Sequence, residues 1–294
     1  VNGRFEVNWE ELERMLSDDR TKLFILCNPQ NPTGRVFTRE ELTRMGNLCI
    51  KHHVTVIADE IHQDVVYSGH KHIPFASICP EFAEITVSFM NPSKTFNVPG
   101  FRTAAFIASN PVLKSAVHEM LVNNKAIGEN ICGTIAFYTA YEQCDYYADQ
   151  LVAYLEKNRD LVEQTLKDVP GIEVTHAEGT YLLWLDCRGL GFESQKALDK
   201  WLVEIAKLGF NSGMSFGPEG EGYARMNIAA PRSTVSIDLQ MPLRLCKKIK
   251  REKDYEEKNS STDLHCRSGY LCPFRMRRQA PCKHSCSCSE RRSR

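Results

Sequence analysis

At 294 residues the chain has room for one large α/β domain and a smaller one, so its size permits an enzyme without indicating one. Its 37 basic residues balance 37 acidic ones, so no overall field favours nucleic acid or an anionic membrane as a partner. No apolar run approaches the roughly 18 residues of a membrane span, and no signal-peptide pattern is present, so we expect a soluble cytoplasmic protein.

Short apolar segments alternate with capped amphipathic segments up to Asn110. Asn8 with Glu11, and Thr38 with Glu41, have the spacing of helix N-terminal caps. The expected strands are Leu23–Cys27, Val54–Ala58, Ile85–Phe89 and Ala104–Ala108. This alternation predicts an α/β fold with a mostly parallel sheet covered by helices.

Two further helices are expected at Pro111–Val122 and Tyr146–Asp168, the second long enough to connect two domains. A smaller α/β unit follows, with strands at Tyr181–Asp186 and Ala224–Ile228 and a helix at Ser194–Leu208. We therefore expect part of a large domain over residues 1–145, and an interdomain helix with a small C-terminal domain over residues 146–238.

The segment from Leu239 to Arg294 differs in composition, with 15 basic and 6 acidic residues and half of the 12 cysteines. It lacks apolar periodicity, which predicts a divergent, disordered tail; a genuine extension and a misread reading frame would both give this composition. Its cluster Cys282–Cys288 lacks paired Cys-x-x-Cys spacing, so no metal site is predicted. The remaining cysteines are scattered singly, as reduced thiols are. Because the chain begins with Val1, we expect a fragment of a longer protein.

Polar groups follow the predicted strands where open parallel sheets bind their ligands. The turn Asn28–Gly34 follows the first strand, and Asp59 ends the second. Taken singly, a turn of Asn, Pro and Gly and an acid that caps a helix are the simpler interpretations. Lys94 follows the third strand, where desolvation would favour its neutral, nucleophilic amine; a solvated surface lysine is the alternative. Arg102 follows at a distance suited to a phosphate contact.

Together these residues resemble the fold-type I pyridoxal-phosphate (PLP) enzymes of the aminotransferase class I and II superfamily. The family's Asn-Pro-x-Gly turn matches Asn31–Gly34, its strand-end aspartate matches Asp59, and its Ser-Lys pair matches Ser93 and Lys94. Arg102 matches its phosphate-binding arginine. The resemblance covers about residues 1–236 and implies a PLP-transferase fold whose large domain is truncated at its N-terminus.

The resemblance also implies a role for each matching residue. Lys94 would bind PLP as a Schiff base and then move protons, while Asp59 would keep the pyridine nitrogen protonated. Asn31 would donate to the phenolic oxygen of PLP. His62 stands where many relatives have tyrosine and would contact the same oxygen, although a packing or capping histidine is an equal alternative. Arg225 matches the arginine that binds the substrate carboxylate.

Longer strings resemble the cystathionine β-lyase-like group of MalY and PatB. They are 26–36, 59–62, 94–97, 179–186 and 217–222. The group implies a carbon–sulfur β-lyase that releases a thiol, pyruvate and ammonia from a cysteine S-conjugate, a small amino-acid substrate. An aminotransferase would use nearly the same residues, and a catalytically incomplete fragment or regulatory protein is the third hypothesis. Because relatives are homodimers with shared sites, we expect a homodimer.

Overall fold

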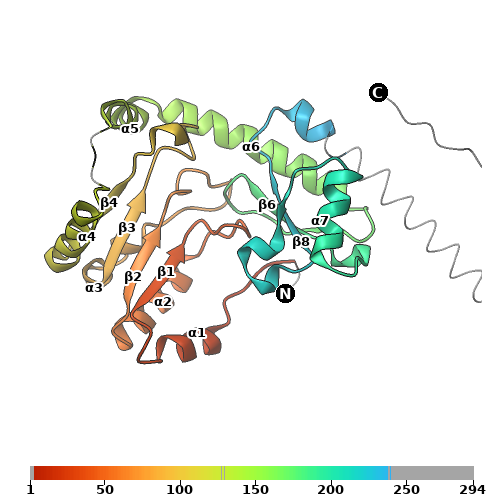
Figure 1. Ribbon diagram of the computed structural model, residues 1–294. Helices are drawn as coiled ribbons and strands as arrows, with labels where there is room; N and C mark the ends of the chain where they lie inside the picture. The colour runs from red at the N-terminus through yellow and green to blue at the C-terminus, as the bar shows by residue number, and fades with distance from the viewer. Residues whose placement is uncertain (1–2, 127, 129, 238, 240–294) are drawn as a thin grey trace, which may run out of the picture. The chain divides into compact units, whose positions relative to one another are not determined.

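The computed structural model describes residues 3–126, 128, 130–237 and 239, which belong to one compact unit. Two separate sheets are seen in this part of the chain, and the long helix α6 extends between them (Figure 1). The predicted boundary between residues 145 and 146 stays a prediction. The predicted tail lies outside the described residues, apart from Leu239.

The elements follow one another in an order close to the predicted one. The α-helices are α1 (Trp9–Leu16), α2 (Arg39–Lys51), α3 (Pro80–Glu84), α4 (Pro111–Asn123), α5 (Ile131–Gln143), α6 (Asp145–Leu166) and α7 (Gln195–Glu204). The strands are β1 (Leu23–Cys27), β2 (Thr55–Asp59), β3 (Thr86–Met90), β4 (Ala105–Ile107), β5 (Glu173–Val174), β6 (Leu182–Asp186), β7 (Asn211–Ser212) and β8 (Tyr223–Asn227). Short 3₁₀ turns lie at Phe75–Ser77, Pro99–Phe101, Arg188–Leu190, Gly213–Phe216 and Pro218–Gly220.

The first sheet has the strand order β1-β2-β3-β4. Strands β1, β2 and β3 are parallel, and β4 is antiparallel to β3. The link from β3 to β4 contains a short 3₁₀ turn in place of the α-helix that usually crosses over between parallel strands. The expectation of a mostly parallel sheet is therefore confirmed, with an antiparallel strand at one edge.

The predicted caps form as expected. Asn8 accepts a hydrogen bond from the backbone of Glu11, and Thr38 and Glu41 form a reciprocal capping box at the start of α2. The apolar face of α2 packs on β2 in a buried cluster that contains Leu42, Met45, Cys49, Val54, Val56 and Ala58. On the other face of β1, Ile25 is 70% exposed. The apolar residues of α2 thus identify the face of the first sheet that this helix covers.

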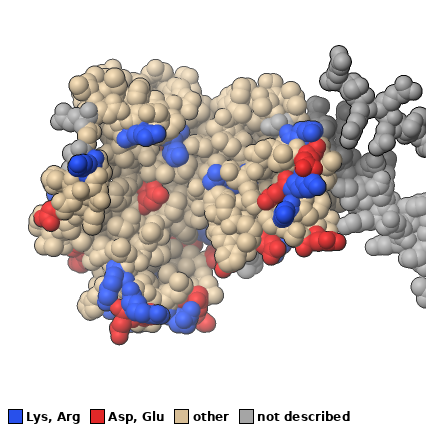
Figure 2. Space-filling model, viewed as in Figure 1, with Lys and Arg blue, Asp and Glu red and all other residues tan. Residues whose placement is uncertain are grey.

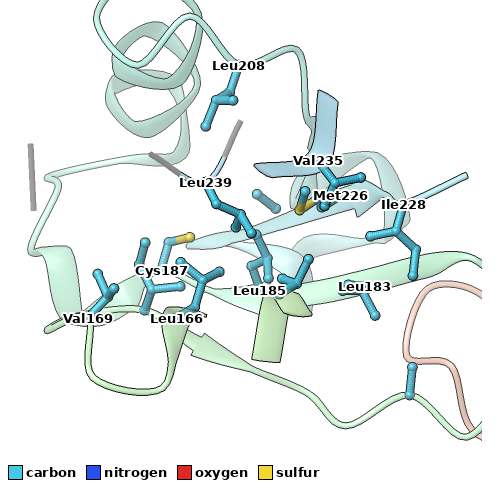
Figure 3. Packing of buried hydrophobic residues seen from close by; sticks show 14 of the residues in the cluster. Leu166, Val169, Leu183, Leu185, Cys187, Leu208, Met226, Ile228, Val235 and Leu239 are labelled. Carbon is cyan, nitrogen blue, oxygen red and sulfur yellow. The ribbon is translucent and has the colours of Figure 1, made fainter. Parts of the chain in front are cut away.

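The second sheet has the order β5-β6-β8-β7 and is antiparallel throughout. Leu183 and Leu185 of β6, with Met226 of β8 and Ile228 just beyond it, belong to the core beneath this sheet (Figure 3). Leu155, Val162 and Leu166 of α6 belong to the same core. The second sheet and the C-terminal part of α6 therefore share one hydrophobic core.

Two local features differ from the expectations. Helix α5 was not predicted, because its sequence ICGTIAFYTAYEQ is apolar on most sides and has no clear helical period. The helix expected at Ser194–Leu208 ends at Glu204 instead. Lys207 has φ of 57°, and the Leu208 amide donates to the Leu202 carbonyl. Leu208, the last residue of the expected helix, therefore lies beyond the helix.

The distribution of charged side chains and the state of the cysteines are as expected from the amino-acid composition. Basic and acidic side chains lie next to one another on the face seen in Figure 2. The six described cysteines, from Cys27 to Cys187, are free thiols. Among the described residues, no helix is both long and apolar enough to cross a bilayer.

Candidate active site

The carboxyl ends of β1, β2 and β3 meet at one edge of the first sheet. In register, Cys27 of β1 faces Asp59 of β2, and Asp59 faces Phe89 of β3. The Asp59 carboxylate is half-buried and accepts a backbone hydrogen bond from Ile61 at 3.3 Å. An anionic group is therefore fixed at this edge, where the sequence predicted it.

The turn after β1 is held rigidly. The buried Asn28 side chain accepts from the Phe37 amide at 3.1 Å, and the Gly34 amide donates to the Gln30 carbonyl at 2.8 Å. Gly34 has φ of 72°, and a Cβ there would lie 2.7 Å from that of Ala177. A side chain at Gly34 would therefore clash as well as strain the backbone.

The same turn is bonded to the chain that leads into β6. The amides of Glu178 and Gly179 both donate to the Gly34 carbonyl, at 2.9 and 3.0 Å. The buried Glu178 carboxylate also accepts from the Val36 amide at 2.8 Å. These bonds place Asn31, in the turn after β1, beside residues of the second sheet.

Asn31 and Arg225 are in direct contact although 194 residues separate them. Nη1 of Arg225 donates to Oδ1 of Asn31 at 2.9 Å, and Nη2 donates to Oδ1 of Asn211 at 2.9 Å. The guanidinium lies 4.8 Å from the centre of the Phe216 ring. Its Nε is buried without a partner in the described chain. The direction of the Arg225 guanidinium is thus fixed, and its Nε remains a donor without a partner in the described chain.

Lys94 lies in the loop after β3 and is half-buried. Within the part of the chain that the structure describes, no hydrogen bond or ion pair engages its amine. The amine borders a cavity of about 350 Å³ that Ser93 and Tyr181 also line. Within the described chain, Lys94 therefore presents an unpaired amine to an open volume.

The Lys94 loop is supported from behind by residues that the sequence analysis missed. Buried Thr95 donates to Oδ2 of Asp64 at 3.0 Å. Tyr141 of α5 is 3.3 Å from the same oxygen and 3.1 Å from the Asn91 carbonyl oxygen. Burial raises the pKa of Asp64, and the two hydroxyl donors oppose that rise. The spacing of Asp64 and Lys94 gave no signal of this contact, because it depends on the unpredicted helix α5.

His62 lies within the electrostatic reach of both Lys94 and Arg225. It is 3% exposed, its Nδ1 has no partner among the described residues, and its ring meets Tyr181 edge-on at 5.5 Å. Burial, together with the nearby charges of Lys94 and Arg225, lowers the pKa of His62 to about 4. The ring is therefore neutral at neutral pH, with an unsatisfied nitrogen in the site.

Ser93 and Arg102 are the two residues that were expected to contact the phosphate. The Ser93 amide donates to the Asn91 side chain at 3.0 Å, and Ser93 lines the cavity. Arg102 is exposed, at a left-handed position with φ of 48°. In the described chain it makes no hydrogen bond or ion pair with Ser93 or Lys94. Arg102 thus stays available to an anion without being drawn into the cluster.

The arrangement can bind and process a small anionic molecule. A paired and directed guanidinium can hold a carboxylate, and an unpaired amine can form a bond to an aldehyde or move a proton. Asp59 can stabilise a nearby positive charge. Asn31, His62, Lys94 and Arg225 are therefore brought together as predicted, and Tyr181 and Asn211 are added to them.

Comparison with known proteins gives concordant matches. The family described as "Aminotransferase class I and II" matches residues 1–237. Cystathionine beta-lyase PatB of Bacillus subtilis is 37% identical over 240 residues, which are 81% of this chain and 62% of PatB. Protein MalY of Escherichia coli is 34% identical over 226 residues, 76% of this chain and 57% of MalY.

A solved structure shows the same fold. Cystalysin from Treponema denticola, whose crystal structure contains a pyridoxal 5'-phosphate cofactor, superimposes with a TM-score of 0.81 at 30% sequence identity. The match covers 85% of this chain and 63% of cystalysin. The chain thus spans less than two thirds of each of these three proteins.

Proposed function

The chain belongs to the aminotransferase class I and II family, and on that premise we propose that the protein is a PLP-dependent carbon–sulfur β-lyase. Its substrates would be cysteine S-conjugates such as cystathionine. One conjugate and one water would give a thiol, pyruvate and ammonium. Relatives named as cystathionine β-lyases support the reaction type. The matches to PatB and MalY confirm the group that the sequence motifs indicated.

The observation that carries the proposal is the amine of Lys94, which is unpaired within the described chain, in a site where Asn31 orients Arg225. The charges of Lys94 and Arg225 both act on His62. The site also holds a buried nitrogen on His62 and a buried Nε on Arg225 that have no partner among the described residues. Such unsatisfied groups suit a polar ligand, because a buried polar atom without a partner is costly. The donors and charges present therefore fit PLP and an amino acid together.

We assign the cofactor contacts as follows. Lys94 would hold the aldehyde carbon of PLP, and Asp59 would keep the pyridine nitrogen protonated. Asn31 uses its Oδ1 for Arg225, so its amide N–H groups remain for the phenolic oxygen. His62 would contact the same oxygen, and Ser93 and Arg102 would bind the phosphate. When bound, PLP supplies an electron sink conjugated with the α-carbon of the substrate.

The substrate contacts follow from charge and direction. Arg225 would bind the α-carboxylate, since Asn31 and Asn211 already orient its guanidinium. Lys94, once displaced by the substrate amine, would take the proton from Cα and later return a proton as the products leave. The burial of His62 keeps it neutral, so it adds no third cation near these groups.

The reaction is tested by supplying the purified protein with PLP and cystathionine or a simpler S-conjugate, and measuring pyruvate and thiol. We expect both products in equal amounts without any added 2-oxo acid. The second candidate is an aminotransferase, which the family description itself favours. Amino exchange that depends on a 2-oxo acid, with no thiol release, would establish the aminotransferase and exclude the lyase.

The oligomeric state and the cellular location of the protein are also proposals. We propose that the complete protein is a cytoplasmic homodimer. The family resemblance supports the dimer, and uncharged side chains exposed on α4 and α5, among them Met120, Ile131 and Ile135, support it further.

A further inference from the structure

We propose that the cavity beside Lys94 binds the group attached to the substrate sulfur, and that it selects an uncharged aryl or branched alkyl group. The inference rests on the lyase function proposed above and names its substrate class. It makes cystathionine, whose distal group is a charged amino acid, a poorer substrate than an S-aryl cysteine.

The cavity has one predominantly apolar wall. Helix α6 contributes Tyr147, Leu151, Tyr154 and Leu155, which lie on one face because they recur at helical spacing. Residues 229–231, which follow β8, also line it. The volume of about 350 Å³ lies within the range of small-molecule sites.

The described residues that line the cavity offer no carboxylate to the ammonium of a second amino-acid group. Lys94 is the one charged side chain among the described residues that line the cavity, and its amine is reserved for the reaction. An ammonium and a carboxylate entering this space would lose water without gaining an ion pair. An aryl or alkyl group would instead gain from burial against the α6 wall.

The wall is held in place before any ligand binds. The Arg232 amide donates to the Tyr154 hydroxyl at 2.7 Å, and the Arg232 guanidinium lies 5.0 Å from the centre of that ring. Tyr147 stacks on Phe96 of the Lys94 loop, with ring centres 5.9 Å apart. A fixed wall lowers the entropic cost of binding, so it can discriminate between substituents.

The cavity is continuous with the reacting groups. Lys94 and Tyr181 line it, and the Tyr181 ring lies within the electrostatic reach of Arg225. Asn227, two residues beyond Arg225 on β8, lines it as well. An amino acid with its carboxylate at Arg225 and its α-carbon at Lys94 therefore has this cavity as adjoining space for its sulfur substituent.

The first test measures binding without catalysis. Thioanisole, an unreactive aryl thioether, is titrated into the full chain by calorimetry. We expect saturable binding in the wild type and at least about tenfold weaker binding in Leu151→Lys, because a charge then occupies the apolar wall. Gln150→Lys, on the exposed side of the same helix, is the matched control and should bind as the wild type does. Absence of saturable binding, or equal binding by both lysine variants, would overturn the proposal.

The second test measures specificity. Thiol release from S-phenyl-L-cysteine, L-cystathionine and S-methyl-L-cysteine is compared by kcat/KM. We expect S-phenyl-L-cysteine to exceed cystathionine by about tenfold or more, and Leu151→Lys to lower kcat/KM for the phenyl substrate while S-methyl-L-cysteine changes less than about twofold.

A further variant supports the test of the cavity, and further outcomes distinguish failure of the cavity assignment from failure of the proposed lyase function. Ala229→Asp places a carboxylate in the cavity from an exposed position, so it should reproduce the loss if Leu151→Lys fails to fold. A wild type that processes all three substrates with cystathionine preferred would refute the cavity assignment and leave the lyase intact. A wild type that binds thioanisole but releases no thiol would refute the lyase and retain the cavity.

Discussion

Two asparagines orient the guanidinium of Arg225 for its proposed role in substrate binding. Asn31 and Asn211 each accept one of its terminal N–H groups at 2.9 Å, which fixes the plane of the guanidinium. The sequence could predict Arg225 and Asn31 separately, but only through the family resemblance, because no local pattern links residues 194 positions apart. Asn211 could not be predicted, since β7 has only two residues and no strand pattern.

Arg225→Lys should weaken substrate binding more than it lowers turnover. A lysine keeps the charge but cannot make a forked contact with a carboxylate, so we expect kcat/KM to fall about 10- to 100-fold, mostly through KM. Steady-state thiol release measures the change. Arg188→Lys, at an exposed arginine that pairs with Asp186, is the control. An unchanged KM in Arg225→Lys would contradict its role in substrate binding.

Two histidines whose side chains are largely removed from water, His62 and His72, make stability depend on pH. Burial lowers the pKa of both His62 and His72 to about 4 from 6.5. Below pH 6.5 the unfolded chain takes up protons that the folded chain refuses, so the free energy of unfolding falls until about pH 4. The loss is up to about 1.4 kcal/mol per pH unit for each histidine.

Chemical denaturation at pH 7 and pH 5 measures this loss. His72→Gln removes one of the two groups, so its stability should fall less over that interval than that of the wild type. The same difference between the two pH values in variant and wild type would show that His72 is not held neutral by the fold.

At the level of elements, the loop after β3 depends on a helix that the sequence did not reveal. The cap and apolar face of α2 predicted its position, because Thr38, Glu41 and Leu42 follow a pattern that local chemistry explains. Helix α5 has no such pattern, and therefore its contact from Tyr141 to Asp64 was invisible before the structure. The support of Lys94 is thus a tertiary feature, whereas the strand before it was predictable.

Asp64→Ala should loosen this loop. It removes the acceptor for the Thr95 hydroxyl, which is fully buried, and we expect a loss of about 1–3 kcal/mol in the free energy of unfolding. Asp64→Asn retains an acceptor oxygen and should lose less. Thermal or chemical denaturation compares the two variants. Equal stability of Asp64→Ala and the wild type would show that the network contributes nothing to the loop.

At the level of the whole molecule, the order of the elements and the mostly parallel sheet were predictable, and the junction of the two sheets was not. The hydrogen bonds from Glu178 and Gly179 to Gly34 create the site by joining distant segments. Neither hydrophobic period nor turn chemistry shows such pairing. The family resemblance supplied it indirectly, by assigning Asn31 to the cofactor and Arg225 to the substrate of one site.

The proposed homodimer is tested by sedimentation velocity on the complete protein. We expect a dimer, and we expect Ile135→Glu to shift it towards monomer because Ile135 is an exposed apolar residue of α5. Glu142→Gln, a conservative exposed change on the same helix, should leave the dimer intact. A fully active wild-type monomer would contradict the proposal.

The central claim is that Lys94 carries PLP, and chemical trapping tests it most directly. The 294-residue chain is incubated with PLP, reduced with borohydride, digested and analysed by mass spectrometry, with Lys94→Ala in parallel. We predict one phosphopyridoxyl adduct, on Lys94, that is absent from the variant. An adduct on other lysines with none on Lys94, or no adduct at all, would contradict the account.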